Sequence, residues 1–125
     1  IISSPALRAL TTAQLMAKEI DYDPQSIQQN RQLYFEGVPA MMDVIHRLDP
    51  SLSSVMLVAH NPDITSLLNR LCGFQVSDMP TCAVATVKLD LNNDWLEVAF
   101  DSGKMIDFDY PKKLTWLEQI EGLLI

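Results

Sequence analysis

Apolar residues in the middle of the chain are spaced to give a strand followed by a helix. Residues 55–59 form a short apolar run, which has the length of a buried strand. His60 follows directly, and a proline two positions later suits the first turn of a helix but not its interior. Over residues 64–71 the apolar side chains recur at helical spacing. The pattern therefore predicts a strand, a turn that carries His60, and a helix that ends at Gly73.

A similar junction opens the chain. Residues 1–2 resemble the end of a core strand, after which Ser4 can cap a helix and Pro5 fits its first turn. Apolar spacing extends this helix to Ile20. Arg8 lies near its amino end, where the helix dipole favours anions over cations, and a bound anion would explain its presence there. Because a chain rarely begins in the last turn of a core strand, we expect further sequence upstream.

The remaining pattern predicts one α/β domain over residues 1–125. Residues 21–37 form a turn and an irregular segment, and a helix follows in which His46 is expected at the surface or at its boundary. After Pro80 the apolar positions alternate with polar ones, which is the period of a strand. The expected later elements are helices over residues 38–48 and 115–124, and a meander of strands over residues 83–91, 95–100 and 104–110.

Composition narrows the classes of partner. The formal net charge is −7, which makes nucleic acid and anionic membranes poor partners because their binding requires basic patches. Apolar residues make up 48% of the chain, yet no apolar run approaches the ~20 residues of a membrane span, and no signal-peptide pattern is present. Cys72 and Cys82 lack metal-ligand spacing. We expect two free, buried thiols in a reducing cytoplasm, and a disulfide between them is the less favoured alternative.

The two strand–helix junctions point to an anion site. If their strands are neighbours in a parallel sheet, Arg8 and His60 meet at the same carboxyl edge, where α/β proteins bind ligands. An arginine fork, an imidazole and the N–H groups at the start of a helix together suit a phosphate. The alternative is that His60 is only a turn residue at a capped junction.

Several motifs, taken in order, resemble the histidine phosphatase superfamily. They are Ser-Ser-Pro-Ala-Leu-Arg-Ala at residues 3–9, Thr-Ala at 12–13 and His-Asn-Pro at 60–62. The segments at residues 33–36 and 105–114 are also similar to the small SixA-type phosphohistidine phosphatases. The resemblance covers residues 1–114. It implies a three-layer α/β/α fold like that of phosphoglycerate mutase, with helices on both faces of a mixed, mostly parallel sheet.

The resemblance also assigns site residues. Arg8 matches the arginine that clamps the phosphate, and His60 the second histidine, which contacts the transferring phosphoryl group, with Asn61 beside it. Glu36 lies near the position where some members carry an acid. Thr81 and Cys82 lie where a later loop of the family approaches the pocket.

One part of the family pattern is missing. The nucleophile of the family is a histidine in an Arg-His-Gly motif on the first strand, and this motif does not occur in the 125 residues. His46 sits within a predicted helix, which is the wrong context. We therefore expect the first strand and the nucleophile to lie upstream, in a longer protein. The implied chemistry is a two-step phosphoryl transfer that needs neither a metal nor a cofactor.

The sequence thus predicts a metal-independent phosphohistidine phosphatase in the cytoplasm. Its expected partner is a phosphorylated protein domain, because the interval between Arg8 and His60 leaves no room for a lid over a small substrate. Two alternatives remain open, namely a phosphatase of a small phosphate ester and a non-catalytic phosphate-binding domain.

Overall fold

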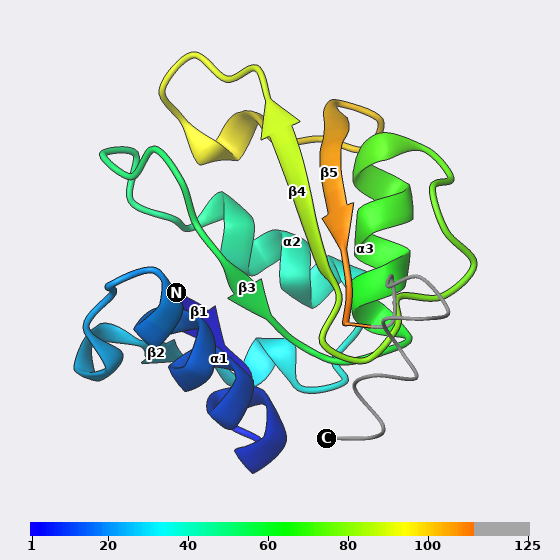
Figure 1. Cartoon of the computed structure of the whole chain (residues 1–125). Coiled ribbons are helices and arrows are strands. Elements are labelled where there is room, and N and C mark those ends of the chain that lie inside the picture. Colours follow the sequence, from blue (N-terminus) through cyan, green and yellow to red (C-terminus); the bar gives the residue numbers. More distant parts are fainter. Residues whose placement is uncertain (112–125) are drawn as a thin grey trace.

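A three-stranded parallel sheet forms the amino-terminal half of the molecule (Figure 1). The computed structural model describes residues 1–111. Its sheet has the order β2-β1-β3, in which β1 (Ile2–Ser3) pairs with β2 (Gln28–Gln29) on one side and with β3 (Leu57–Val58) on the other. The strand expected to end at the start of the chain and the strand predicted at residues 55–59 are therefore present, although both are short. Since β1 and β3 are neighbours, the two strand–helix junctions lie at the same edge of the sheet.

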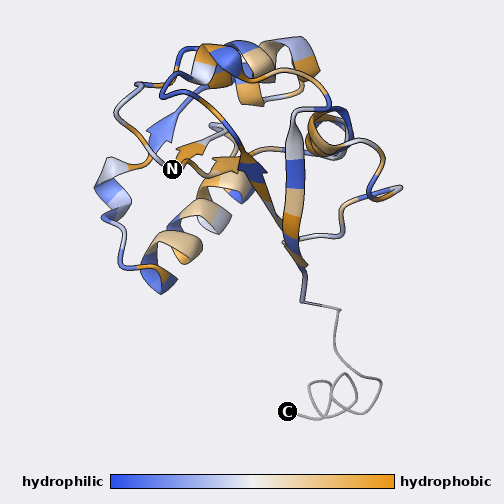
Figure 2. Cartoon of the chain, turned by 90° about the horizontal axis from the view of Figure 1, so that it is seen from above, coloured by the Kyte–Doolittle hydropathy of each residue, from blue (hydrophilic) through white to orange (hydrophobic). Residues whose placement is uncertain are grey.

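Helices lie on both sides of this sheet. Helix α1 (Leu7–Glu19) follows β1 and covers one face, whereas α2 (Val38–His46) lies on the opposite side, as the view from above also shows (Figure 2). The face of α1 that is turned inward carries alanines at positions 9, 13 and 17, all buried. These small side chains let the helix approach the strands closely. Helix α3 (Asp63–Cys72) follows β3 and packs on α2.

The amino end of α1 differs from the prediction. Ser4 was expected to cap a helix that starts at Pro5, but Ala6 occupies the N-cap position and no side chain caps this end. The helix therefore begins two residues later. The hydroxyl group of Ser4 is instead directed at His60, with 2.7 Å between the Ser4 Oγ and the His60 Nε2.

A separate antiparallel hairpin forms the carboxyl-terminal half. Strand β4 (Val84–Leu89) pairs with β5 (Gly103–Asp109), and β4 shows the predicted alternation of exposed and half-buried side chains. The prediction of a strand at residues 95–100 is wrong. This segment begins with a 3₁₀ turn, η3 (Trp95–Glu97), because the carboxylate of Asp94 accepts the backbone N–H of Leu96 at 3.0 Å. The meander is thus a two-stranded hairpin with a long connection.

The irregular segment between α1 and α2 also follows the prediction, with two 3₁₀ turns, η1 (Pro24–Ser26) and η2 (Arg31–Leu33), on either side of β2. The closing helix predicted at residues 115–124 lies outside the described residues. Over residues 1–111 the chain is a small α/β fold with three α-helices, a parallel sheet and a small antiparallel sheet.

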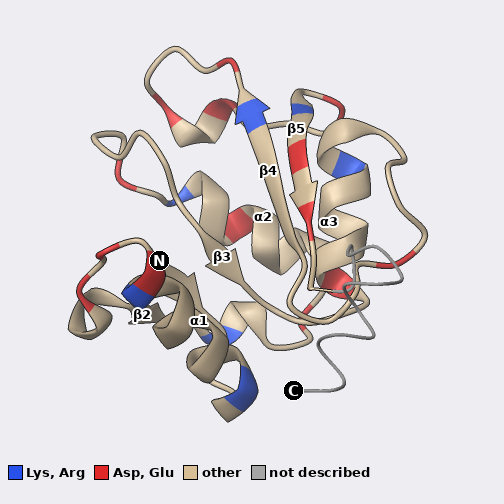
Figure 3. Ribbon diagram, in the orientation of Figure 1, with Lys and Arg blue, Asp and Glu red and all other residues tan. Residues whose placement is uncertain are grey.

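The hydrophobic core joins the two halves through α2 and α3. Its buried members come from β1, η2, α2, α3 and the segments after α2 and η3: Ile2, Leu33, Met41, Met42, Val44, Ile45, Leu48, Leu67, Leu71 and Val98. Acidic residues are spread over loops and strands, and no large basic patch is visible in the view of Figure 3. Within residues 1–111 there is no helix with the length and hydropathy of a transmembrane span.

A polar stripe on α3 fixes the chain that returns from it. Asn69 accepts the backbone N–H groups of Gln75 and Val76 at 2.8 and 3.2 Å, and its amide group donates to the carbonyl of Val76 at 2.7 Å. One turn earlier, the hydroxyl of Thr65 accepts the N–H of Met79 at 2.9 Å. The segment that leads into β4 is therefore bound to the side of α3.

Candidate functional site

His60 lies at the carboxyl end of β3, directly before α3. Its side chain is buried, with 7% exposed, and its Nε2 lies 2.7 Å from the Oγ of Ser4, a residue with no exposed surface. The backbone N–H of Ser4 also donates to the carbonyl of Val58 at 2.8 Å. The junctions after β1 and β3 are thereby tied to each other through both backbone and side chain.

Arg8 reaches the same place from the first turn of α1. Its guanidinium carbon lies 6.0 Å from the ring centroid of Phe35, and this ring stacks on the imidazole of His60 at 4.7 Å with an interplanar angle of 18°. Arg8 is exposed and makes no ion pair with the described residues. The structure therefore brings Arg8 and His60 together, as the sequence predicted, with Phe35 in contact with both.

Two aromatic side chains surround the imidazole. Phe35 covers one face of the ring, and Tyr34 meets it edge-on with 5.4 Å between centroids. Both remain about half exposed, at 46% and 48%. Phe35 also has a φ of 54°, in the left-handed region that bulky residues rarely adopt. Such backbone strain is concentrated at functional sites, where the surrounding structure holds it in place.

The environment of His60 favours its neutral form. Burial lowers the pKa of the imidazole below its ordinary value of 6.5, and the charge of Arg8 lowers this pKa further, whereas Asp63 opposes the shift. Because the folded-state pKa is lowered, His60 favours folding above pH 6.5, and this contribution is lost as the pH falls through the lowered value. A neutral imidazole beside a guanidinium that has no ion pair among the described residues can donate a hydrogen bond to an anion that the arginine attracts.

Asn61 holds the loop beside the site. Its amide nitrogen donates to the carbonyl of Met79 at 2.7 Å, and its amide oxygen accepts the hydroxyl of Thr65 at 2.6 Å. Thr65 in turn accepts the N–H of Met79, so that three hydrogen bonds close a ring. Asn61 thus has a structural role in this loop, and its contact with phosphate stays a prediction.

Glu36, Thr81 and Cys82 are all exposed, and none of them makes a hydrogen bond to Arg8 or His60 in the described part of the chain. Thr81 and Cys82 form a turn that is closed by a bond of 3.0 Å from the N–H of Ala83 to the carbonyl of Pro80. Their roles, like that of Glu36, remain predictions.

The expectation of two buried thiols is wrong for Cys82, which lies on this exposed turn, whereas Cys72 is half-buried. Both cysteines are free, and burial raises the pKa of the Cys72 thiol.

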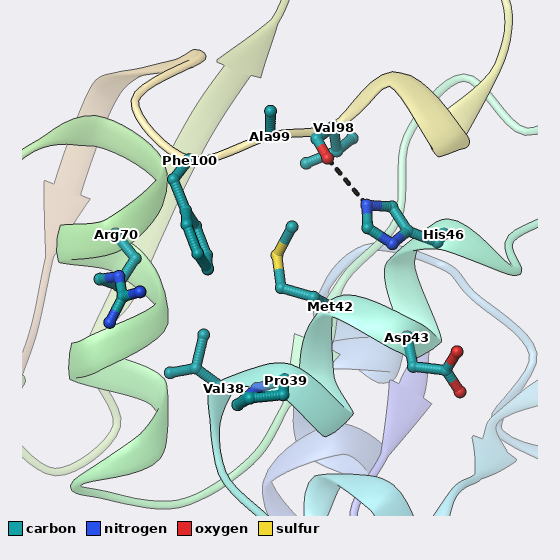
Figure 4. A pocket seen from close by; sticks show the side chains of 9 residues that line it. All are labelled: Val38, Pro39, Met42, Asp43, His46, Arg70, Val98, Ala99 and Phe100. Atoms are coloured by element: carbon teal, nitrogen blue, oxygen red, sulfur yellow. Dashed lines mark hydrogen bonds between the residues drawn. The ribbon is translucent and has the colours of Figure 1, made fainter.

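His46 belongs to a different part of the surface. It lines an apolar groove of about 610 Å³ between α2, α3 and the segment after η3 (Figure 4). Its Nε2–H donates to the carbonyl of Val98 at 2.8 Å. On the other side of the groove, the guanidinium carbon of Arg70 lies 4.3 Å from the ring centroid of Phe100 (Figure 4). Neither Arg8 nor His60 lines this groove. His46 is therefore a boundary histidine, as predicted, and lies apart from the candidate site.

Sequence reasoning missed three contributors to the site. Ser4 was interpreted as a helix cap, and Tyr34 and Phe35 entered only as part of a similar segment. The pattern of polar and apolar residues does not predict that Phe35 packs on His60, because the position of this side chain depends on the left-handed backbone conformation of Phe35 itself. The pair of Ser4 and His60 also has the spacing of an activated serine. Since Ser4 has no exposed surface, its hydroxyl cannot reach a substrate, and we assign it no nucleophilic role.

The chain matches no protein-family model, and no curated protein or solved structure shows significant similarity to it. The likeness to the histidine phosphatase superfamily therefore rests on the motifs themselves.

The charges around His60 predict how its pKa responds to substitution. We expect Arg8→Ala to raise the pKa of His60 towards 6.5, because it removes a neighbouring cation, and Asp63→Asn to lower it further. The measurement is an NMR titration of the imidazole Cε1–H signals in each variant, with Lys18→Ala on the same helix as the control for loss of charge. Unchanged titration in Arg8→Ala would mean that Arg8 and His60 do not share a site.

Proposed function

We propose that this chain supplies the phosphate-binding side of a metal-independent phosphohistidine phosphatase of the histidine phosphatase superfamily. The observation that carries the proposal is the meeting of Arg8 and His60 at the carboxyl edge of the parallel sheet, with Phe35 in contact with both. An exposed arginine that has no carboxylate partner within residues 1–111, next to a neutral imidazole, suits a dianionic phosphoryl group. The order of the motifs along the chain supports the same assignment.

The two side chains divide the work of phosphoryl transfer. Phosphoryl transfer depends mainly on positioning and on stabilising charge at the phosphoryl oxygens. Arg8 neutralises this charge with its planar fork, and His60 donates a hydrogen bond from its ring. Phe35 and Tyr34 exclude water from the imidazole on two sides, which strengthens both interactions.

The nucleophile in this proposal is a histidine of an Arg-His-Gly segment that is not among the 125 residues. Its ring nitrogen attacks phosphorus while the bond from phosphorus to the substrate imidazole breaks, and the leaving imidazole takes up a proton. Water then attacks the phosphorylated histidine, and inorganic phosphate leaves with the free histidine restored. His46 cannot serve, because its Nε2 is bound to the carbonyl of Val98 in a separate groove.

Among the open strand edges of the described residues, those of β3 and β4 are placed to receive that segment. Within residues 1–111, β3 has a strand partner only on the side of β1, and β4 only on the side of β5. In the view of Figure 1, β4 is the next strand after β3 as one crosses the molecule from β1 to β5. A parallel strand added to β3 would end beside His60, which is where the nucleophile is required. With that strand in place the molecule would form the three-layer arrangement of the family.

The open surroundings of the site favour a protein substrate. Arg8, Tyr34 and Phe35 are all exposed, and no described segment covers them. A small ester would bury little surface in such a site and would bind weakly. A phosphohistidine on the surface of a folded domain brings its own surface to exclude water. The rim it would meet is aromatic rather than basic, in keeping with the net charge of −7.

The test has two parts. We expect the chain of 125 residues to bind inorganic phosphate, seen as shifts of the His60 imidazole signals, but to form no phosphoenzyme and to give no burst of phosphate release. A protein that also carries the Arg-His-Gly segment should dephosphorylate a phosphohistidine-bearing domain with a higher kcat/KM than any of a panel of small phosphate esters.

Each outcome has a separate meaning. A phosphoenzyme formed by the 125 residues alone would refute the assignment of the nucleophile. A preference for a small ester would overturn the substrate class while leaving the roles of Arg8 and His60 intact. Phosphate binding without turnover in the protein that carries Arg-His-Gly would indicate a non-catalytic binding domain.

A further inference from the structure

The hydroxyl group of Ser4 makes two defined contacts. Its Oγ accepts the backbone N–H of Ala6 at 3.3 Å and lies 2.7 Å from the Nε2 of His60. The neighbouring Ser3 directs its own hydroxyl to the carbonyl of Ser4 at 2.8 Å, so it does not compete for the imidazole. Ser4 has no exposed surface, and its hydroxyl therefore has no access to bulk water.

These contacts determine where the hydroxyl proton goes. A serine hydroxyl has one proton to donate. A buried hydroxyl whose proton has no acceptor destabilises the folded state. The N–H of Ala6 is itself a donor, and among the described residues the only acceptor in contact with this hydroxyl is the Nε2 of His60. The O–H of Ser4 thus donates to Nε2, and in a neutral imidazole the remaining proton must then lie on Nδ1.

We propose that Ser4 is a positioning residue that holds His60 as the Nδ1–H tautomer and so presents Nδ1–H to the anion beside Arg8. The choice of tautomer follows from the contacts of Ser4 alone, whereas its role in phosphoryl transfer rests on the proposed function. Nδ1 has no hydrogen-bond partner within residues 1–111, which leaves it available to a ligand.

Neighbouring groups keep the ring in this orientation. Phe35 stacks on one face of the imidazole and Tyr34 meets it edge-on, so that rotation of the ring would displace two aromatic contacts. The charged groups that act on His60 are Arg8 and Asp63. Burial and Arg8 lower the pKa of His60, which keeps the imidazole neutral and therefore able to accept the Ser4 proton at neutral pH.

The tautomer has a chemical consequence for the site. A nitrogen that attacks phosphorus needs a free lone pair. In the Nδ1–H form the lone pair of Nε2 is occupied by the hydroxyl of Ser4, and Nδ1 carries a proton. His60 is thereby restricted to donating a hydrogen bond and is prevented from taking the phosphoryl group itself. The same contact that orients His60 thus reserves the nucleophilic role for another histidine.

Long-range ¹H–¹⁵N correlation spectra of the imidazole, recorded above the pKa of His60, test the assignment directly. In the unsubstituted chain we expect a protonated Nδ1 and an unprotonated Nε2. Ser4→Ala should shift the population towards the Nε2–H form, whereas Ser4→Thr, which keeps the hydroxyl, should retain Nδ1–H. Ser3→Ala is the matched control, since its hydroxyl serves only the carbonyl of Ser4. An Nε2–H form in the unsubstituted chain would overturn the proposal without any variant.

Turnover separates this proposal from the proposed function. In the protein that carries Arg-His-Gly, Ser4→Ala should lower kcat roughly tenfold to a hundredfold, as for other hydrogen-bond partners that orient a functional histidine, with a smaller change in KM. Ser4→Thr should restore most of this loss. An Nδ1–H tautomer in a protein without phosphatase activity would support the assignment that Ser4 fixes the tautomer of His60 and would refute the proposed function. Full activity in Ser4→Ala would refute the positioning role.

Discussion

If the proposed function is correct, replacing Arg8 with alanine is expected to lower kcat/KM roughly a hundredfold to a thousandfold in a protein that also carries the Arg-His-Gly segment. This is the range for removing one preorganised group that stabilises charge in the transition state. Arg8 is exposed and forms no ion pair with the described residues, so its removal leaves no buried group unpaired. The free energy of unfolding should therefore change little. Steady-state kinetics on a phosphohistidine-bearing domain, with thermal unfolding of the same samples, measure both quantities.

Two further variants make the Arg8 result specific. Arg8→Lys keeps the charge but loses the planar fork, and we expect activity between those of the unsubstituted protein and Arg8→Ala. Lys18→Ala removes a positive charge from the exposed far end of the same helix and should retain full activity. If Lys18→Ala lost as much activity as Arg8→Ala, the effect would be one of net charge and not of a phosphate clamp.

Replacing His60 with alanine should reduce kcat/KM by a similar factor, but with a loss of stability that Arg8→Ala does not share. From the sequence alone His60 would face an open crevice, and its removal would leave the fold unaffected. The structure shows a side chain with only 7% exposed that is bonded to a buried serine. Alanine would leave the proton of the Ser4 hydroxyl without its acceptor and Phe35 without its stacking partner. We expect a cost of about 1–3 kcal/mol in the free energy of unfolding.

Chemical unfolding and phosphatase kinetics on the same preparation separate the two effects of His60→Ala. His46→Ala is the control, because it also removes a histidine with one side-chain hydrogen bond, in this case to the carbonyl of Val98 in the groove between α2 and α3. It should retain activity. If the activity of His60→Ala per amount of folded protein equalled that of the unsubstituted protein, the role of His60 would be purely structural.

Periodicity predicted most of the fold correctly. The three α-helices and strands β1, β3, β4 and β5 begin and end within two residues of the positions that apolar spacing indicates, because regular elements bury their apolar side chains at a fixed period. The segment at residues 95–100 was misinterpreted for a local reason. Its alternating residues suit a strand, but Asp94 immediately before them forms a turn with its own backbone, and this interaction prevails.

The candidate site could be predicted only in part. Arg8 and His60 follow strands that are neighbours in a parallel sheet, and the general rule for such sheets brings them together. The contributions of Ser4 and Phe35 depend on tertiary contacts that no local pattern encodes. Ser4 in particular satisfies the rule for a helix cap, but its hydroxyl group bonds to a histidine that lies 56 positions further along the chain.

The hydrogen bonds of Asn61, Thr65 and Asn69 have a consequence for how the molecule responds to force and to insertion. The parallel sheet and the hairpin share no strand pairing within residues 1–111, so the position of the hairpin depends on α3 and on the chain bound along it. Helix α3 therefore links the two sheets mechanically, and its amino end lies at the turn that carries His60. Residues inserted between Gly73 and Gln75 would loop out ahead of the first clamp and leave this linkage rigid. Residues inserted between Val76 and Met79 would fall between the two attachment points at Asn69 and Thr65 and slacken the linkage, so that a displacement of the hairpin would no longer be passed to the turn that carries His60.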